Sequence, residues 1–161
     1  MSVNYDVPSY QTHIAGVELT APNQSLICQT TTGPQDLIDM PAGYAGRNLP
    51  DVSFNADPDT GYAEYYQGGW EYGWGGTSFV APQLNGVFAL VTQAAGGRLG
   101  YLNPQLYSIF RQTGYSALSP FKPITTGDNE YWLATKHYNP ASGLGTLDVT
   151  KLAFTFGLWD F

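Results

Sequence analysis

The eight residues GGTSFVAP at positions 75–82 decide how this chain folds and point to its chemistry. Two glycines allow a sharp backbone turn and leave room for a ligand's backbone to approach. The run PQLNGVFALV at 82–91 then carries apolar residues at helical spacings of three and four. Pro82 is tolerated in a first helical turn, where its missing N–H is no loss. The pattern therefore predicts that Ser78 lies in a glycine-rich turn entering a buried helix.

A serine in such a turn has two interpretations. It can be an ordinary helix N-cap, since Ser and Thr are common caps. It can also be a nucleophile, because its hydroxyl is held rigidly and the N–H groups of the first helical turn can face a developing negative oxygen. A short GTS string by itself favours the cap. The choice therefore depends on the rest of the chain.

Charge in this chain is sparse and acidic. Its 161 residues hold 6 Lys+Arg and 13 Asp+Glu, a net charge of −7, and charged residues make up 12% of the total, against roughly 25% in an average protein. Six scattered cations cannot form a basic patch, so we expect no nucleic-acid partner. No apolar run approaches membrane-spanning length, so we expect no membrane partner either. A fold with few salt bridges loses little when carboxylates protonate, which favours a secreted protein that works in acid.

Two segments before the central stretch have readable patterns. Residues 23–48, with the cluster TTTGP at 30–34, predict a long loop or insertion. Val52 and Phe54 suit a short buried strand, and DPDTG at 57–61 is a turn in which proline fixes φ and glycine supplies freedom. The carboxylates Asp51, Asp57 and Asp59 are therefore expected to hold this turn rather than to act as catalytic acids.

Three further local patterns flank the central stretch. The aromatic segments 62–66 and 70–74 surround Gln-Gly-Gly at 67–69 and predict a hairpin. Its aromatic side chains would either wall a substrate cleft or form the exposed face of a ribbon. The glycines at 96–97 would end the helix of 82–91. A second helix is expected over 102–110, with Asn103 as its cap and Pro104 as its first residue.

Several ordered motifs resemble one family of peptidases. Gly-Thr-Ser followed by two residues and Ala-Pro resembles the nucleophile segment of subtilisin-like enzymes, and the doubled glycine is most similar to the sedolisin, or serine-carboxyl peptidase, family. PDVSFNADPDTGY at 50–62 and LNPQLY at 102–107 also resemble sedolisin segments. The resemblance implies an α/β fold with a subtilisin-like parallel-sheet core, of which residues 1–161 would be the C-terminal portion of the catalytic domain.

The resemblance also implies a reaction. Ser78 would be the nucleophile that forms an acyl-enzyme, and a peptide substrate would lie across Gly75, Gly76 and Thr77. A serine hydroxyl needs a neighbouring base. The only histidines, His13 and His137, lie in segments where exposure or a structural role is the favoured interpretation. Sedolisins instead use a Glu paired with an Asp, with another Asp assisting at the oxyanion, and carboxylate bases suit acidic pH.

Those family carboxylates lie on segments that precede every motif matched in this chain. Ser78 would therefore act only with a complementary chain that carries the N-terminal half of the catalytic domain. The expected function is a secreted or extracellular, acid-acting serine-carboxyl endopeptidase. The alternative is a non-catalytic structural or assembly protein derived from such a peptidase, and a Ser-His hydrolase of the wider subtilisin type remains a third interpretation.

Two later segments resemble the part of the family that binds calcium. They are PITTGDN at 123–129 and YNPASGLGT at 138–146, and their sedolisin counterparts hold the ion through two aspartates and backbone carbonyls. Pro123 and Asn139 stand where those aspartates would be, and Thr135 and His137 replace two glycines. Carboxylates usually supply most of the affinity for calcium. We therefore expect no metal and no other cofactor, and no spacing argument places Asp128 as a substitute ligand.

Overall fold

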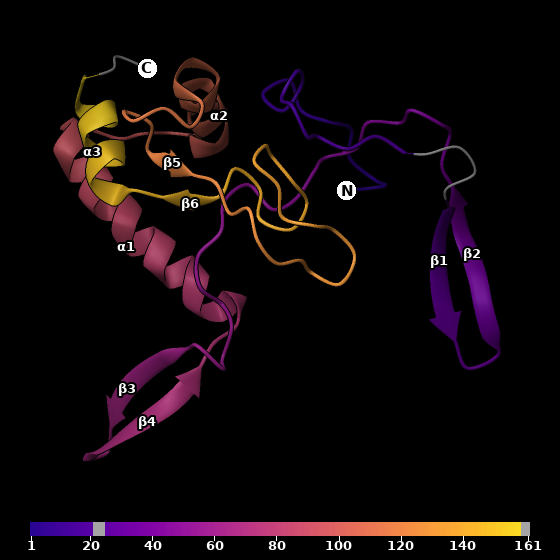
Figure 1. The fold of residues 1–161 in the computed structure, drawn as a ribbon, viewed down its shortest axis with the longest axis horizontal. Helices are drawn as coiled ribbons and strands as arrows, with labels where there is room; N and C mark the ends of the chain where they lie inside the picture. The colour runs from indigo at the N-terminus through magenta and orange to yellow at the C-terminus, as the bar shows by residue number, and fades with distance from the viewer. Residues whose placement is uncertain (21–24, 159–161) are drawn as a thin grey trace. The chain divides into compact units, whose positions relative to one another are not determined.

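The computed structural model describes residues 1–20 and 25–158. Figure 1 shows the elements, which are β1 (Ser25–Thr30), β2 (Gly33–Asp39), β3 (Tyr62–Tyr66), β4 (Gly69–Trp74), α1 (Thr77–Ala95), α2 (Leu102–Thr113), β5 (Phe121–Lys122), β6 (Thr146–Leu147) and α3 (Val149–Leu158). The chain divides into two compact units. The first comprises Met1–Asp51 and Pro123–Leu144, and the second comprises Val52–Lys122 and the residues from Gly145 on.

Every sheet in the described residues is a two-stranded antiparallel pair: β1 with β2, β3 with β4, and β5 with β6. Such pairs close through local turns, whereas parallel neighbours need a crossover connection of about a dozen or more residues. The described part of the chain therefore contains helices and strands but no parallel pair. The subtilisin-like parallel core stays a prediction. No helix in residues 1–20 and 25–158 is long and apolar enough to cross a membrane.

A β-hairpin lies within the segment 23–48, which the sequence predicted as a long loop or insertion. Strands β1 and β2 supply 6 and 7 of its residues and pair with each other, so the segment contains regular structure, and its being an insertion stays a prediction. The Thr30 hydroxyl donates to the Gly33 carbonyl at 2.7 Å and closes the turn between the strands. Ile27 on β1 and Leu37 on β2 are both exposed, so these two apolar residues do not mark a buried face. Residues 23 and 24 lie outside the described residues.

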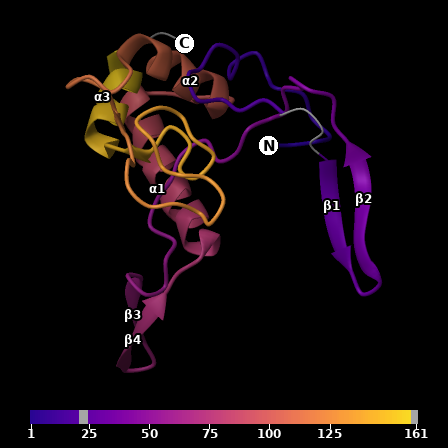
Figure 2. The ribbon, with the colours of Figure 1, turned by 45° about the vertical axis from the view of Figure 1, so that its right-hand side comes forward.

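The predicted hairpin at 62–74 is confirmed as β3 and β4. Its turn residues Gln67 and Gly68 have φ values of 48° and 87°, and a two-residue type I′ turn requires positive φ at both positions. Tyr65 lies opposite Trp70, and their rings meet edge-on at 5.4 Å. The hairpin extends beyond the N-terminal end of α1 (Figures 1 and 2), and Tyr65, Trp70 and Tyr72 are exposed along it.

Helix α1 begins earlier and is more exposed than the sequence predicts. It starts at Thr77, so Pro82 is its sixth residue rather than part of its first turn. Val91 is its one fully buried residue, and Leu90 is 60% exposed. The expectation of a buried helix is therefore wrong for the described chain, in which α3 is the element packed along α1 (Figure 1). The helix ends as predicted, at Gly96 in the left-handed conformation with φ 72°.

Three other local predictions need correction. Helix α2 begins at Leu102 with Tyr101 as its N-cap, so Asn103 is not the cap and Pro104 is the third helical residue. Val52 and Phe54 are half-buried in a segment without regular structure, because no neighbouring strand in the described residues pairs with it.

Helix α3 carries a start signal that sequence reasoning missed. The Asp148 carboxylate accepts the Lys151 N–H at 3.2 Å, which is an N-terminal cap. Leu152 and Phe156, four residues apart on one face, are buried. The core of the second unit consists of Val91, Leu106, Tyr107, Ile109, Phe121, Leu147, Leu152 and Phe156.

Polar residues share the buried part of the first unit. The Gln11 side-chain amide donates to the Asn48 carbonyl at 2.9 Å, and the Asn48 N–H donates back to Gln11 Oε1 at 3.0 Å. Ile14, Tyr138 and Leu144 supply its buried apolar side chains. Burial raises the pKa of the Tyr138 phenol far above its usual range. This unit is therefore held by reciprocal hydrogen bonds together with a small apolar core.

Candidate active site

Ser78 is the second residue of α1, and its side chain is exposed. The N-cap of the helix is Gly76, with φ 92° and ψ 162°, and no side chain caps the first turn. The interpretation of Ser78 as an N-cap is therefore wrong. The Phe79 N–H donates to the Gly76 carbonyl at 3.0 Å. The amides of Thr77 and Ser78 have no backbone acceptor among the described residues, as expected at a helix start.

The turn before Ser78 rests directly on backbone from the segment 56–58. A Cβ at Gly75 would lie 2.6 Å from the Pro58 nitrogen and 2.7 Å from the Ala56 carbonyl oxygen. The Gly76 N–H donates to that same carbonyl at 2.6 Å. A Cβ at Gly61 would likewise meet the Trp74 carbonyl. The two segments that resemble sedolisin motifs are thus in backbone contact, and only glycine fits at the points where they meet.

Asp57 holds the turn that supports Ser78, as predicted. Its carboxylate accepts the Asp59 N–H at 3.0 Å and the Thr60 hydroxyl at 2.9 Å. The hydrogen bond from the Asp59 backbone is the largest cause that lowers the pKa of Asp57 below its ordinary value. Asp51 does not hold this turn, contrary to the prediction, because its carboxylate pairs with Arg47 in the first unit. Neither carboxylate is placed as a catalytic acid.

Aromatic side chains fix the residue next to Ser78. The Tyr62 ring stacks on Phe79 with centroids 5.5 Å apart and planes within 5° of parallel. Trp74 contacts the same ring at 6.1 Å. The Tyr62 hydroxyl donates to the Asn55 carbonyl at 2.7 Å. The first turn of α1 is therefore held both by the glycine turn and by the hairpin that precedes it.

The described residues supply no base to Ser78. No hydrogen bond joins the Ser78 hydroxyl to another group in residues 1–20 and 25–158. The unit that carries Ser78 contains no histidine, because His13 and His137 both belong to the first unit, where both are exposed. The site therefore offers an exposed serine beside two helix-start amides, with no base among the described residues.

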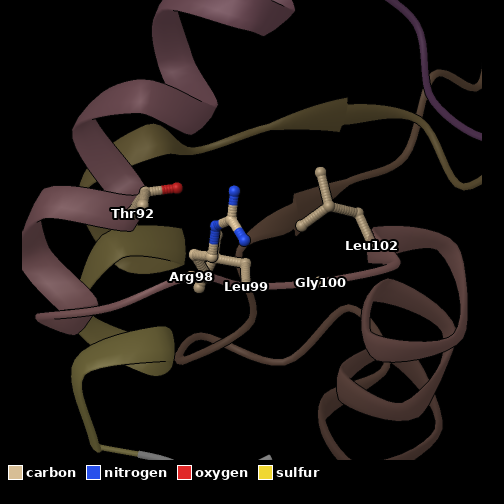
Figure 3. A pocket seen from close by; sticks show the side chains of 5 residues that line it. All are labelled: Thr92, Arg98, Leu99, Gly100 and Leu102. Carbon is tan, nitrogen blue, oxygen red and sulfur yellow. The ribbon is translucent and has the colours of Figure 1, made fainter.

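A surface recess of about 360 Å³ lies at the other end of α1. Thr92 and Arg98 project toward it, and Leu99, Gly100 and Leu102 complete its lining (Figure 3). Thr92 follows Ser78 by 14 positions, which is about 21 Å along a helix that rises 1.5 Å per residue. This recess is separate from the Ser78 turn. No sequence motif marked it.

The residues in the two segments that resemble the family's calcium-binding part do not fit a calcium ion. Asn139 is 4% exposed, and its amide nitrogen donates to the carbonyls of Thr135 and His137 at 3.1 Å each. A cation ligand would have to present oxygen at that point. Pro123 has no side-chain oxygen, and the Asp128 carboxylate accepts the Glu130 N–H at 2.9 Å in a local turn. The described residues contain no group of three His, Cys, Asp or Glu side chains suited to a metal.

Comparison with known proteins identifies relatives of this chain, although no protein-family model matches it. It is 38% identical over 112 residues to kumamolisin of Bacillus sp. (strain MN-32), which covers 66% of this chain. It is 36% identical over 128 residues to tripeptidyl-peptidase sed4 of Aspergillus fumigatus, covering 68%. It is 32% identical over 117 residues to sedolisin of Pseudomonas sp. (strain 101), covering 70%.

The matches cover only 19%, 21% and 19% of these three relatives. The chain therefore corresponds to about a fifth of the length of the curated relatives it matches. Within that part the predicted resemblance is confirmed by three relatives of one family. Over the two thirds of its length that match, this chain belongs to the sedolisin family.

Proposed function

We propose that this chain is the nucleophile-bearing part of an acid-acting serine-carboxyl endopeptidase, with Ser78 as the nucleophile. The observation that carries the proposal is the exposed Ser78 in the first turn of α1, directly after a glycine turn fixed by the backbone contact between Gly75 and residues 56–58. A nucleophile must be held in place before it reacts, because orientation supplies a large part of catalysis. The family relationship supports a peptide substrate.

In the proposed reaction, the peptide lies across the turn Gly75-Gly76-Thr77, of which Gly76 and Thr77 are exposed. A carboxylate base takes the proton of Ser78 while Oγ attacks the peptide carbonyl carbon. The helix-start amides face the negative oxygen of the tetrahedral intermediate. The C–N bond breaks, the amine leaves with the proton, and water hydrolyses the acyl-enzyme ester.

The base in this proposal belongs to a complementary chain with the Glu and Asp residues of the family. Two features support a missing neighbour. Leu90 on α1 and Phe154 on α3, two helices that pack together, are 60% and 67% exposed, and large exposed apolar patches mark interaction sites. The hairpin also presents Tyr65, Trp70 and Tyr72 to solvent. A partner that covered these surfaces would form an obligate interface of roughly 2,000 Å² or more, and would add the strands of a parallel core.

The proposed setting is extracellular and acidic. A carboxylate base works at a pH at which imidazole is already protonated, and the chain has few ion pairs to lose there. No metal takes part in the proposed reaction.

A non-catalytic role in structure or assembly is the second candidate. The lack of a base beside Ser78 in the described residues favours it. It keeps the same complementary chain and the same covered surfaces, but it requires no chemistry at Ser78. The two candidates therefore differ in one measurable property, which is whether the assembled protein cleaves peptide bonds through Ser78.

The experiment is proteolysis by the assembled protein with Ser78→Ala. The variant should lose turnover completely, because only the nucleophile is removed. Its stability should change by less than about 0.5 kcal/mol, since an exposed side chain that caps nothing is lost. Ser116→Ala, another exposed serine in the same unit, is the matched control and should retain full activity.

The assay compares acidic with neutral pH on an unstructured protein substrate. Activity that peaks in acid and disappears in Ser78→Ala supports the peptidase. Equal activity of the variant contradicts it. A stable complex without activity at any pH supports the structural role. Light scattering and hydrogen exchange of the chain alone test the partner: a monodisperse monomer with a well-protected core would contradict the complementary chain.

A further inference from the structure

We infer that the side-chain amide of Asn139 takes the place of a cation in the loop 135–143, so that this loop is ordered without a metal. Two backbone carbonyls, those of Thr135 and His137, converge on the Asn139 amide nitrogen at 3.1 Å each. Converging carbonyl oxygens are an arrangement that cations commonly fill. In this chain two N–H bonds of a neutral group fill it. The inference concerns the first unit and is independent of the chemistry at Ser78.

The other end of the Asn139 side chain is equally engaged. Its oxygen accepts the N–H groups of Ala141 and Ser142 at 3.2 and 2.9 Å, and the Ser142 hydroxyl at 3.0 Å. These three donors and the two carbonyl acceptors fix which end of the amide is nitrogen and which is oxygen. In a flipped amide, Nδ2 would face the three donors and Oδ1 would face the two carbonyl oxygens, and neither atom could form a hydrogen bond there. The residue is 4% exposed, so water does not replace these bonds.

The hydrogen bonds of the Asn139 side chain order the backbone that joins the two ends of the first unit. The Gly143 N–H donates to the Asn139 carbonyl at 2.7 Å, and the Asn139 N–H donates back to Gly143 at 3.2 Å. Gly143 then passes so close to Asp51 that a Cβ would lie 2.6 Å from its carbonyl carbon. The Leu144 N–H donates to the Asp51 carbonyl at 2.8 Å. The Asn139 amide thus holds the loop that closes against Asp51.

An aspartate cannot make the same set of bonds without help. It has nearly the shape of asparagine and would still accept the three donors. Its second oxygen would face the Thr135 and His137 carbonyls, and three oxygens in contact repel one another in a buried site. A divalent cation between them would restore attraction. Asn139→Asp is therefore expected to turn a metal-independent loop into one that requires a cation.

The test is hydrogen exchange of the peptide 135–144, measured on the chain in the assembly in which it purifies. Each protein is compared in excess EDTA and in excess calcium chloride. The natural chain should exchange at the same rate in both. Asn139→Asp should exchange about 10- to 100-fold faster in EDTA, the loss expected for unsatisfied buried hydrogen-bonding groups, and should slow again with calcium.

Asn129→Asp is the matched control. Asn129 is exposed, and its oxygen accepts the N–H groups of Tyr131 and Trp132 at 3.3 and 2.7 Å. Its amide nitrogen also donates to the Pro140 carbonyl, at 3.4 Å, and water can replace this long bond because the residue is exposed. Aspartate keeps both accepted bonds, so this variant should exchange less than about 3-fold faster than the natural chain and should show no calcium response. It carries the same added charge, and a calcium response in it would show that charge alone, rather than the position of Asn139, produces the effect, which would overturn the inference.

Two results on the other proteins would also overturn the inference. One is a natural chain whose loop loses protection in EDTA and regains it with calcium. The other is an Asn139→Asp variant as protected as the natural chain in EDTA. If Asn139→Asp fails to fold in both solutions, calorimetric titration of the natural chain with calcium chloride decides: binding heat contradicts the inference, and its absence supports it.

Discussion

The Ser78 turn and the Asn139 loop both resemble sedolisin segments, but they are built in opposite ways. At Ser78 the geometry comes from backbone packed on backbone, with glycines where Gly75 and Gly61 meet the facing chain. At Asn139 it comes from one side chain that makes five polar contacts. A backbone contact accepts no other residue, whereas a side-chain hub accepts any group that offers the same donors and acceptors. The difference explains how this chain keeps the motif around Ser78 and departs from the motif at Asn139.

The largest expected effect comes from filling the backbone contact at the Ser78 turn. Gly75→Ala would place a methyl group 2.6–2.8 Å from backbone atoms of Ala56 and Pro58. One segment must move, at a cost of about 3 kcal/mol or more. Chemical denaturation should show this loss, and proteolysis should fall with it because Ser78 is displaced.

Gly86→Ala, in the same helix, is the control for that substitution. Nothing lies within 4 Å of a Cβ at Gly86, so alanine should stabilise α1 by about 0.5–1 kcal/mol through its better helix propensity. Equal effects of the two substitutions would contradict the claim that backbone packing sets the position of Ser78.

A smaller loss of stability is expected when one hydrogen bond to the Asn139 side chain is removed. Ser142→Ala removes the hydroxyl that donates to Asn139 Oδ1 and leaves the two N–H donors from Ala141 and Ser142 in place. The loss should be about 1 kcal/mol, measured by denaturant unfolding. Because the carbonyls of Thr135 and His137 stay satisfied, the variant should show no calcium dependence. If Ser142→Ala lost as much stability as Gly75→Ala, the contrast between backbone packing at Gly75 and side-chain hydrogen bonding at Asn139 would be contradicted.

The smallest effect concerns pH at the turn beneath Ser78. The pKa of Asp57 is lowered in the folded chain, chiefly by the hydrogen bond from the Asp59 N–H. The stabilisation is therefore fully present above the ordinary value of 3.8 and is lost as pH falls through the lowered pKa. Asp57→Asn should flatten the acid side of the melting-temperature profile slightly, because the group is exposed. A variant profile as steep as that of the natural chain would assign the acid loss to other carboxylates.

Local signals in the sequence were enough to predict some elements. The Gln67-Gly68 turn and the helix end at Gly96 depend on residues that reach positive φ, and such signals do not need the rest of the fold. The predicted role of Asp57 in its turn is likewise local and is confirmed. The contact between Gly75 and Ala56 was not predicted, because it joins segments that nothing in the pattern brings together.

Other elements could not be predicted, because they depend on contacts between residues that the sequence pattern does not reveal. Val52 and Phe54 have strand-like composition, but a strand exists only where a neighbour pairs with it. Helix α1 begins at Thr77 because Gly76 turns the chain there, whereas the preference of proline for a first turn placed the expected start at Pro82. The Asn139 amide was recognised as a missing carboxylate, but its two carbonyl partners became visible only in the folded loop.

The exposed hairpin before Ser78 gives the chain a built-in optical probe. Trp70 and Trp74 are 62% and 39% exposed on β4, and Trp74 ends only four positions before Ser78. The emission of an indole shifts to shorter wavelength when water is removed from it. A peptide or a complementary chain that covers this strand should therefore shift the tryptophan emission to shorter wavelength. The shift should be measurable even under conditions in which no peptide bond is cleaved.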